Sequence, residues 1–304
     1  MVSPSVRGSR SRDPRRNSGA MNDAPPRTDD EAPPGTPDCN ASPSRGLDPE
    51  RIPTRGPVFH FFWPFTRWMV TNFFAFISMV FFEIFNRTII IGRENVGEDP
   101  NTVLLPNHQS MIDGFLVGYA VFFPKTFIKP MLLPWLPAAY ENFFGNPVSR
   151  FFADNWKCIP VKKGRKDFGA MKRMEACLKR GIMIVFPEGT RSRDGRLLPP
   201  RSGIGYVMLK NKAKAIPVCM DGMDRTLPIG HFWPRVFNTI YLYYGPQADL
   251  KEFYDKPADR ETADAAIKKA FGDVARMKTV LSRYRRYRRH LLSKRPFLFR
   301  LYAP

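Results

Sequence analysis

One histidine of this 304-residue chain has neighbours suited to acid–base chemistry. It is His108, in the run NHQSMID over residues 107–113. An aspartate that holds one imidazole nitrogen leaves the other free as a general base near neutral pH. Residues five apart on a straight helix point about 140° from each other, so the two side chains can meet if His108 lies in a turn and Asp113 in the first turn of the next helix. The alternative is a capping box of Ser110 and Asp113 with no catalytic part.

A second polar motif follows a buried apolar run. Residues 182–186 read IMIVF, and residues 187–192 read PEGTRS. A glycine-containing turn with free backbone N–H groups and an arginine suits a phosphate, because a guanidinium binds two oxygens at once. Arg191 is therefore a candidate phosphate ligand. Gly189 lets the backbone approach closely, and Glu188 either orders the turn or binds a hydroxyl of the substrate.

The spacing of apolar residues predicts the elements that position these motifs. Strands are expected at 88–91, 102–105, 182–186 and 215–220, and helices at 110–123 and 171–180. This alternation predicts an α/β domain over residues 88–250, with a mixed sheet flanked by helices.

The N-terminal part of the chain changes composition abruptly. Residues 1–56 hold ten of the 30 prolines and seven serines, so we expect a disordered tail. Residues 57–87 are aromatic-rich, with an uncharged stretch of 15 residues at 68–82. As a helix that stretch is about 22 Å long, short of the roughly 30 Å of a bilayer core. We expect a membrane-associated helix or hairpin, with a single span and a buried core helix as alternatives.

The charge of the chain is strongly basic. There are 48 Lys and Arg against 28 Asp and Glu, and residues 276–304 hold ten basic residues and no acidic one. Such a balance indicates a phosphate-bearing partner, either nucleic acid or lipid. We interpret 251–304 as a basic helical segment whose run at 282–290 forms a cationic belt on anionic lipid, with a solvated helix face as the alternative. Because the chain is rich in aromatic residues, we expect a membrane rather than nucleic acid as the partner, and reduced cysteines favour its cytoplasmic face.

The cysteines indicate core packing rather than chemistry. Cys39, Cys158, Cys177 and Cys219 have no metal or redox spacing, so reduced, mostly buried thiols are expected. No His, Cys and Asp cluster has metal spacing, which predicts no metal. No Gly-x-Ser-x-Gly elbow and no cysteine beside a base occur, so covalent catalysis is unsupported.

Together, the motifs at 107–113 and 186–192 resemble those of the lysophosphatidic acid acyltransferase family of glycerolipid acyltransferases. Both occur in the family's order and at its approximate separation. Two weaker blocks agree: residues 158–163 stand where the family has an apolar strand ending in Asp-Arg, and residues 215–218 look like its late strand. Arg201 and Gly203, which follow the second motif, also resemble residues of the family. The resemblance covers roughly residues 88–250.

The resemblance implies direct acyl transfer from a thioester to a lysophospholipid hydroxyl, without a covalent acyl-enzyme. His108 is then the general base, and Asp113 orients its ring. Lys163 takes the place of the family's phosphate-contacting arginine. A lysine binds phosphate as a point charge, whereas an arginine binds two oxygens at once. The full set of candidate substrate-binding residues is Asn107, Lys162, Lys163, Glu188, Gly189, Thr190 and Arg191.

The expected acceptor is lysophosphatidic acid, and the product is phosphatidic acid. Acyl-CoA or acyl-ACP is the co-substrate, and no cofactor is expected. The apolar segments 114–123 and 127–140 either line an acyl-chain groove or belong to the core. Alternatives are another lysophospholipid or glycerol 3-phosphate as acceptor, or a non-catalytic basic protein that binds membranes or nucleic acid.

Overall fold

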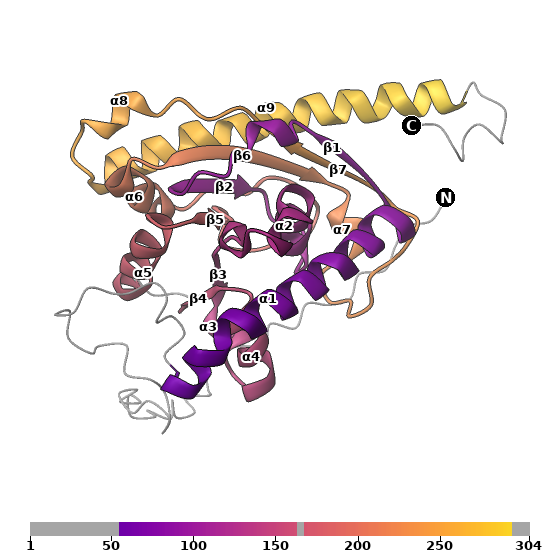
Figure 1. Ribbon diagram of the computed structural model, residues 1–304. Coiled ribbons are helices and arrows are strands. Elements are labelled where there is room, and N and C mark those ends of the chain that lie inside the picture. Colours follow the sequence, from indigo (N-terminus) through magenta and orange to yellow (C-terminus); the bar gives the residue numbers. More distant parts are fainter. Residues whose placement is uncertain (1–54, 163–166, 294–304) are drawn as a thin grey trace, which may run out of the picture. The chain divides into compact units, whose positions relative to one another are not determined.

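The computed structural model describes residues 55–162 and 167–293 (Figure 1). All but the last two residues of the expected N-terminal tail lie outside the described residues, as does Lys163. Cys39 and the last 11 residues of the chain, 294–304, are also outside them.

The described residues form a mixed five-stranded sheet at the centre of the fold. Its order is β1 (Arg87–Ile91), β7 (Thr239–Tyr244), β6 (Lys214–Asp221), β2 (Thr102–Pro106) and β5 (Ile182–Ile184). Only the pair β6 and β7 is antiparallel. Strands β2, β5 and β6 therefore end at one edge, which we call the carboxyl edge, and β1 and β7 begin there.

A smaller parallel pair extends this sheet beyond β5. It consists of β3 (Leu136–Ala139) and β4 (Cys158–Val161). A parallel bridge between Trp135 and Met183 connects it to β5. Strands β3 and β4 consequently also end at the carboxyl edge.

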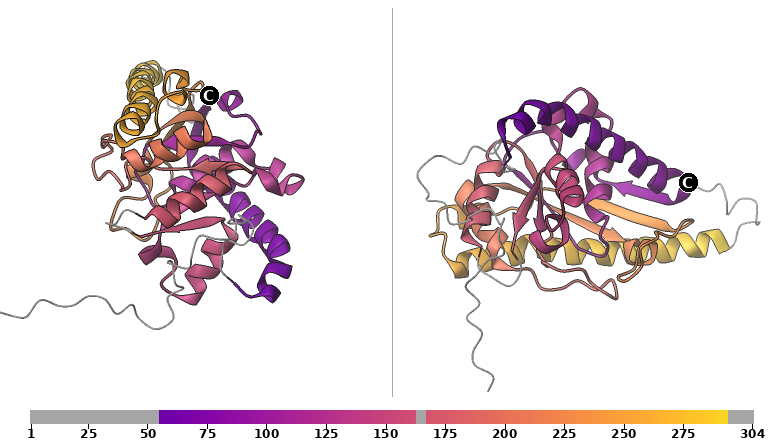
Figure 2. Two further views of the ribbon diagram at one scale, coloured as in Figure 1. Left: turned by 90° about the vertical axis from the view of Figure 1, so that its left-hand side faces the viewer. Right: turned by 90° about the horizontal axis from the view of Figure 1, so that it is seen from below.

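Helices cover both faces of the sheet, as Figures 1 and 2 show. In β2, Leu104 packs in one core with α2 (Asp113–Phe122), while Val103 and Leu105 pack in another. This second core includes α5 (Phe168–Leu178), α6 (Ser202–Asn211) and α9 (Arg260–Ser293). Alternate residues of a strand point to opposite faces, so two helical layers sandwich the strand that carries the first motif.

The shorter helices are α3 (Tyr140–Phe143), α4 (Pro147–Asn155), α7 (Met223–Thr226) and α8 (Lys251–Tyr254), with 3-10 turns at Arg93–Asn95, Lys125–Phe127 and Pro130–Leu132.

The aromatic-rich segment is one continuous helix on the α2 side. It runs as α1 (Pro57–Met79) and continues as the π-helical turn η2 (Val80–Phe85). These 29 residues are long and apolar enough to cross a membrane, by length and composition. One side is packed on the protein: Thr71 donates to the carbonyl of Asn155 at 3.2 Å, and Trp63 is 3% exposed.

The outer side of this helix exposes ten large apolar residues: Val58, Phe61, Phe62, Phe65, Met69, Phe73, Phe76, Ile77, Ile84 and Phe85. One side of this helix thus packs on the protein, and the other side is an exposed apolar surface.

The sequence-based assignment of the fold class is confirmed, with shifts at several ends. The helix expected from residue 110 begins at Asp113, because residues 109 and 110 bond to the Asp113 carboxylate instead of entering the helix. The strand expected to residue 186 ends at Ile184. Strand β7 and helix α6 were not predicted.

The three described cysteines are buried and free, and burial raises the pKa of each thiol to about 12.

The C-terminal segment does not form a core of its own. In α9, Ala263, Ala266, Ile267 and Ala270 pack into the core that also holds β2 and α6. The basic helical segment expected at 251–304 thus packs, through α9, on the sheet domain. The contact is close at Gly205 in α6, where a Cβ atom would stand 2.1 Å from the carbonyl oxygen of Ala263.

This contact predicts opposite outcomes for two glycines of one helix. Gly205→Ala pushes a methyl group into the α9 backbone, so we expect the free energy of unfolding to fall by about 1–3 kcal/mol. Gly203→Ala is the matched control because nothing lies within 4 Å of its Cβ position, and added helix propensity contributes at most about 1 kcal/mol of stability. Urea denaturation followed by circular dichroism measures both. Equal stabilities would contradict the close packing of α6 on α9.

Candidate active site

The turn after β2 brings His108 and Asp113 together. Asp113 Oδ2 lies 3.0 Å from His108 Nδ1 and accepts hydrogen bonds from the backbone N–H groups of Gln109 at 2.7 Å and Ser110 at 2.8 Å. This is the arrangement that the five-residue spacing requires, with the carboxylate in the first turn of α2 reaching back. The bond to Ser110 N is half of a capping box, and the same oxygen also holds the imidazole.

The imidazole of His108 is fixed on one side and open on the other. Its ring stacks on Phe186 with centroids 4.1 Å apart and planes at 22°. The His108 side chain is 19% exposed, whereas that of Asp113 is fully buried. Within the described part of the chain, Nε2 of His108 makes no hydrogen bond. A nitrogen in this position can take a proton from a bound hydroxyl group.

Glu188 connects the second motif to the first. Its Oε1 accepts from the backbone N–H of His108 at 2.9 Å, and its Oε2 accepts from that of Leu198 at 3.0 Å. A return bond runs from Ser192 N to the carbonyl of His108 at 2.8 Å. Burial raises the pKa of the Glu188 carboxyl, and these N–H donors partly oppose the rise. Of the two roles considered for Glu188, the structure displays the ordering of the turn.

The turn at Gly189 presents two guanidinium groups. Gly189 has φ of +67°, and a Cβ atom there would lie 2.7 Å from Nε of Arg201. Gly189 and Thr190 are exposed, and Arg191 is half-buried. No hydrogen bond or ion pair among the described residues engages the Arg191 guanidinium. Two cations beside an exposed turn can bind an anion such as a phosphate.

The other candidate ligands lie elsewhere. Asn107 is 1% exposed, and its side chain bonds to the backbone of β6: Nδ2 donates to the carbonyl of Met220 at 3.1 Å, and Oδ1 accepts from its N–H at 2.7 Å. Lys162 is exposed after β4, three strand spacings from β2, or about 14 Å along the carboxyl edge. Asn107 therefore joins β2 to β6, and Lys162 is remote from His108.

Sequence reasoning missed the contribution of α9. Lys278 Nζ donates to the carbonyl oxygen of Gly195, in the loop that follows the Glu188 motif. Leu197 of this loop packs with Val274 and Leu281 of α9. Arg285 Nη1 pairs with Asp221 Oδ2, at the end of β6, at 2.6 Å. The two polar contacts span 64 and 83 residues of sequence, so no local spacing indicates them.

One cavity lies apart from the His108 turn. A cavity of about 430 Å³ lies near the C-terminal end of α2, whereas His108 adjoins the N-terminal end of that helix. It is lined by Arg93, Glu94, Val96, Glu98, Val121, Phe122 and Lys125. Across residues 55–162 and 167–293, no group of three or more His, Cys, Asp or Glu side chains is placed to hold a metal ion.

Comparisons with known proteins give one consistent family. Residues 87–221 match the family model described as Acyltransferase. A chloroplastic 1-acyl-sn-glycerol-3-phosphate acyltransferase of Brassica napus is 29% identical over 180 residues, which cover 55% of this chain and 48% of that protein. The enzyme of the same name from Salmonella typhimurium is 27% identical over 172 residues, covering 56% and 64%.

A glycerol-3-phosphate acyltransferase of Alteromonas mediterranea is 27% identical over 130 residues, covering 41% of this chain and 15% of that protein. The chain spans about half the length of the first curated relatives that it matches. The crystal structure of the 1-acyl-sn-glycerophosphate acyltransferase PlsC from Thermotoga maritima aligns with a TM-score of 0.51 and 22% identity, over 68% of this chain and 79% of that one. This structural similarity shows a shared fold.

The two bonds of Glu188 predict a stability loss when one acceptor becomes a donor. In Glu188→Gln an NH2 group faces a backbone N–H, so one buried donor is left unpaired, and we expect the free energy of unfolding to fall by about 1–3 kcal/mol. Glu94→Gln is the control because Glu94 is exposed. Chemical denaturation measures both variants. A Glu188→Gln protein as stable as the control would contradict the bridging role of this carboxylate.

Proposed function

Because the chain belongs, through residues 87–221, to the acyltransferase family that includes 1-acyl-sn-glycerol-3-phosphate acyltransferases, we propose that it acylates lysophosphatidic acid. The acyl donor is a thioester, acyl-CoA or acyl-ACP, and the product is phosphatidic acid. The observation that carries the proposal is the His108–Asp113 pair, whose open Nε2 lies at the carboxyl edge beside the Arg191 turn.

The proposed reaction needs one base and no covalent intermediate on the protein. His108 Nε2 takes the proton of the acceptor hydroxyl while its oxygen attacks the thioester carbonyl carbon. Asp113, bonded to Nδ1, stabilises the imidazolium that forms. The tetrahedral intermediate then collapses, the C–S bond breaks, and the leaving sulfur takes the proton from His108. General-base catalysis of this kind accelerates a reaction by roughly 10²–10⁴.

We assign the acceptor phosphate to the turn at residues 189–191. Arg191 supplies a fork of N–H donors, and the exposed Gly189 and Thr190 leave the backbone accessible. Arg201, which lies against Gly189, gives this turn a second positive charge. Lys163 remains the sequence-based candidate for a further contact. Lys162 and Asn107 have no part in this proposal, because the first is remote from His108 and the second is bonded to β6.

We further propose that the protein associates with the cytoplasmic face of a membrane through the outer side of α1. The ten large apolar residues exposed there suit the acyl region of one leaflet. An interfacial position fits better than a span, because the other side of the helix packs on α2 and α4.

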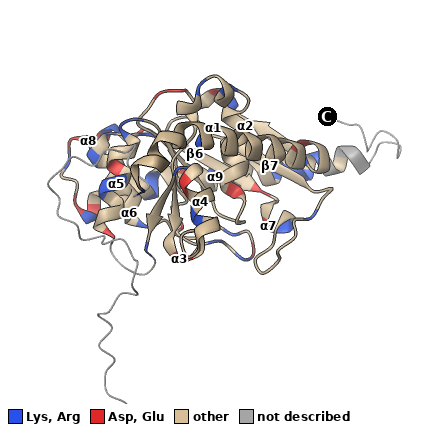
Figure 3. Cartoon of the chain, turned by 60° about the horizontal axis from the view of Figure 1, so that its bottom comes forward, with Lys and Arg blue, Asp and Glu red and all other residues tan. Residues whose placement is uncertain are grey.

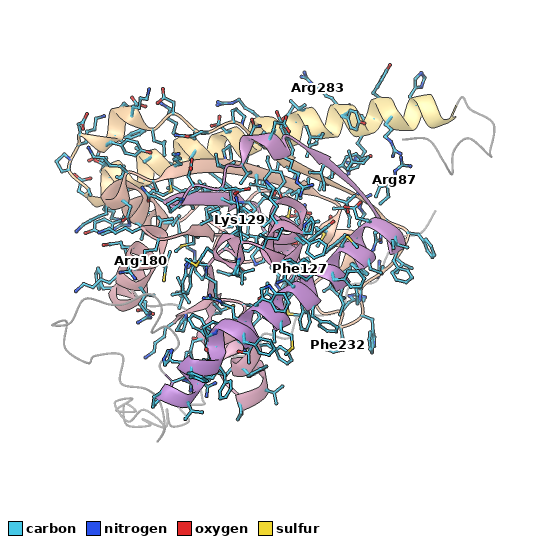
Figure 4. All side chains as sticks on the ribbon, in the orientation of Figure 1. Arg87, Phe127, Lys129, Arg180, Phe232 and Arg283 are labelled. Atoms are coloured by element: carbon cyan, nitrogen blue, oxygen red, sulfur yellow. The ribbon has the colours of Figure 1, made fainter. Side chains whose placement is uncertain are left out.

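The cationic belt expected at 282–290 stays a prediction, and the contact through α1 does not depend on it. Basic residues are spread over α5, α8 and α9 (Figure 3). Helix α1 packs mainly on α2 and α4, whereas α9 packs on α6 and β6, and the exposed Arg283 points away from α1 (Figure 4).

Glycerol 3-phosphate is the second candidate acceptor, favoured by the Alteromonas mediterranea relative. It carries the same phosphate but no acyl chain, so a panel of both acceptors with acyl-CoA and acyl-ACP, read by mass, separates the two reactions. A preference for glycerol 3-phosphate would replace our assignment of the acceptor.

Removal of the base predicts loss of acyl transfer. We expect His108→Ala to lower kcat at least about 10²-fold, because no other group then accepts the hydroxyl proton. The variant should keep its far-UV circular dichroism spectrum. His290→Ala, at an exposed position near the end of α9, is the control and should retain full activity. Wild-type turnover by His108→Ala would remove His108 as the base.

Removal of the proposed phosphate ligand predicts weaker acceptor binding. A hydrogen bond to a charged group contributes about 1.5–3 kcal/mol, so Arg191→Ala should raise KM for lysophosphatidic acid roughly 10- to 100-fold. KM for the acyl donor should change little. Arg180→Ala is the control, because Arg180 follows α5 and precedes β5, at the edge opposite His108. An unchanged acceptor KM in Arg191→Ala would refute the assignment.

A further inference from the structure

The loop between α7 and β7 exposes large aromatic side chains. Phe232 and Trp233 are each 78% exposed, and Phe237 is 88% exposed. The rings of Phe232 and Trp233 stand edge to face, with centroids 5.1 Å apart. Exposing a cluster of aromatic side chains to water is unfavourable in free energy. Such a cluster marks a surface that binds an apolar partner.

Hydrogen bonds hold this loop in its outward position. The N–H of Arg235 donates to the carbonyl of Thr226 at 2.7 Å, and that of Phe237 donates to the carbonyl of Phe85 at 2.7 Å. Phe237 has φ of +63°, a left-handed conformation that bulky residues rarely adopt. The backbone thus keeps Phe237 outside at a conformational cost, so the exposure is built into the loop.

The loop is continuous with the apolar side of α1. Its bond to Phe85 fastens it to the last residue of η2, where Ile84 is 69% and Phe85 is 49% exposed. Phe232 points away from the rest of the protein (Figure 4). Residues 225–244 contain two arginines and no acidic residue. Aromatic side chains flanked by arginine suit the headgroup region of an anionic bilayer.

We propose that residues 231–237 form a second membrane contact, inserting Phe232, Trp233 and Phe237 into the interface of an anionic bilayer. The inference rests on the proposed membrane association of α1. A single interfacial helix leaves the protein free to roll about the helix axis. A second contact away from that axis removes this freedom and sets which part of the protein faces the lipid.

The topology makes that part the carboxyl edge. The loop leads into β7, and η2 leads into β1, and both strands begin at the edge where the His108 turn ends β2. Both contacts therefore lie at the same edge of the sheet as the proposed active site, on its β1–β7 side. A bilayer held by them lies beside His108, so that a lysophospholipid acceptor reaches the base from the membrane.

Vesicle flotation of the full chain tests the proposal. The triple variant Phe232→Ala, Trp233→Ala, Phe237→Ala should bind phosphatidylcholine–phosphatidylglycerol vesicles about tenfold or more weakly than the wild type. Phe168→Ala is the matched control, since this residue is 65% exposed on α5 and lies outside both contacts; its binding should equal that of the wild type. Circular dichroism confirms that each variant folds.

A second measurement locates the side chain itself. Brominated lipids should quench tryptophan fluorescence of the wild type more than that of Trp233→Phe, and the difference reports Trp233 among the five tryptophans. Wild-type flotation of the triple variant, or equal quenching, would overturn the proposal and leave the loop as a protein-docking surface. His108→Ala should float like the wild type, so loss of acyl transfer and loss of this contact are separate outcomes.

Discussion

A single carboxylate oxygen organises the candidate site. Asp113 Oδ2 receives an imidazole nitrogen and two backbone N–H groups, all within 3.0 Å, and the side chain is fully buried. These bonds close the turn between β2 and α2. They also fix the orientation of the His108 ring. Charge-assisted bonds of this kind are the strong ones in proteins, and burial shields them from water. The position of the base is thus a property of the turn and not of one flexible side chain.

Further contacts hold this turn against neighbouring strands. Glu188 bridges the backbone of His108 to residue 198, and Asn107 bonds to β6. Helix α9 then supports the Glu188 loop through Lys278, which makes Lys278 a positioning residue. The site is therefore assembled from segments far apart in sequence, and Glu188 and Asn107 each bind backbone groups of another segment. Such a network resists rearrangement when an anionic substrate binds.

Local chemistry was predictable from the sequence, and long-range placement was not. The five-residue spacing of His108 and Asp113 constrains a turn, and apolar runs mark buried strands, because both signals act within a few residues. The partner of Asn107 lies 113 residues away, so a polar residue after a strand was interpreted as a ligand although it joins two strands. The same limit hid Lys278, whose partner Gly195 lies 83 residues away. Residues 231–237 carried a signal in their aromatic composition, but only the structure shows that they are exposed.

The packing of Leu197 against the middle of α9 has a dynamic consequence. Val274, Met277 and Leu281 belong to the cluster that holds Leu197, whereas the last turns of α9 carry mainly charged and tyrosine side chains. Helix ends fray before cores open, with free energies far below that of global unfolding. Fraying of the turns after residue 281 leaves Val274 and Lys278 in place against the loop at 192–198, and the sheet and the His108 turn remain folded. The support of this loop therefore resides in residues 274–281 of α9, and the turns after them can open without releasing it.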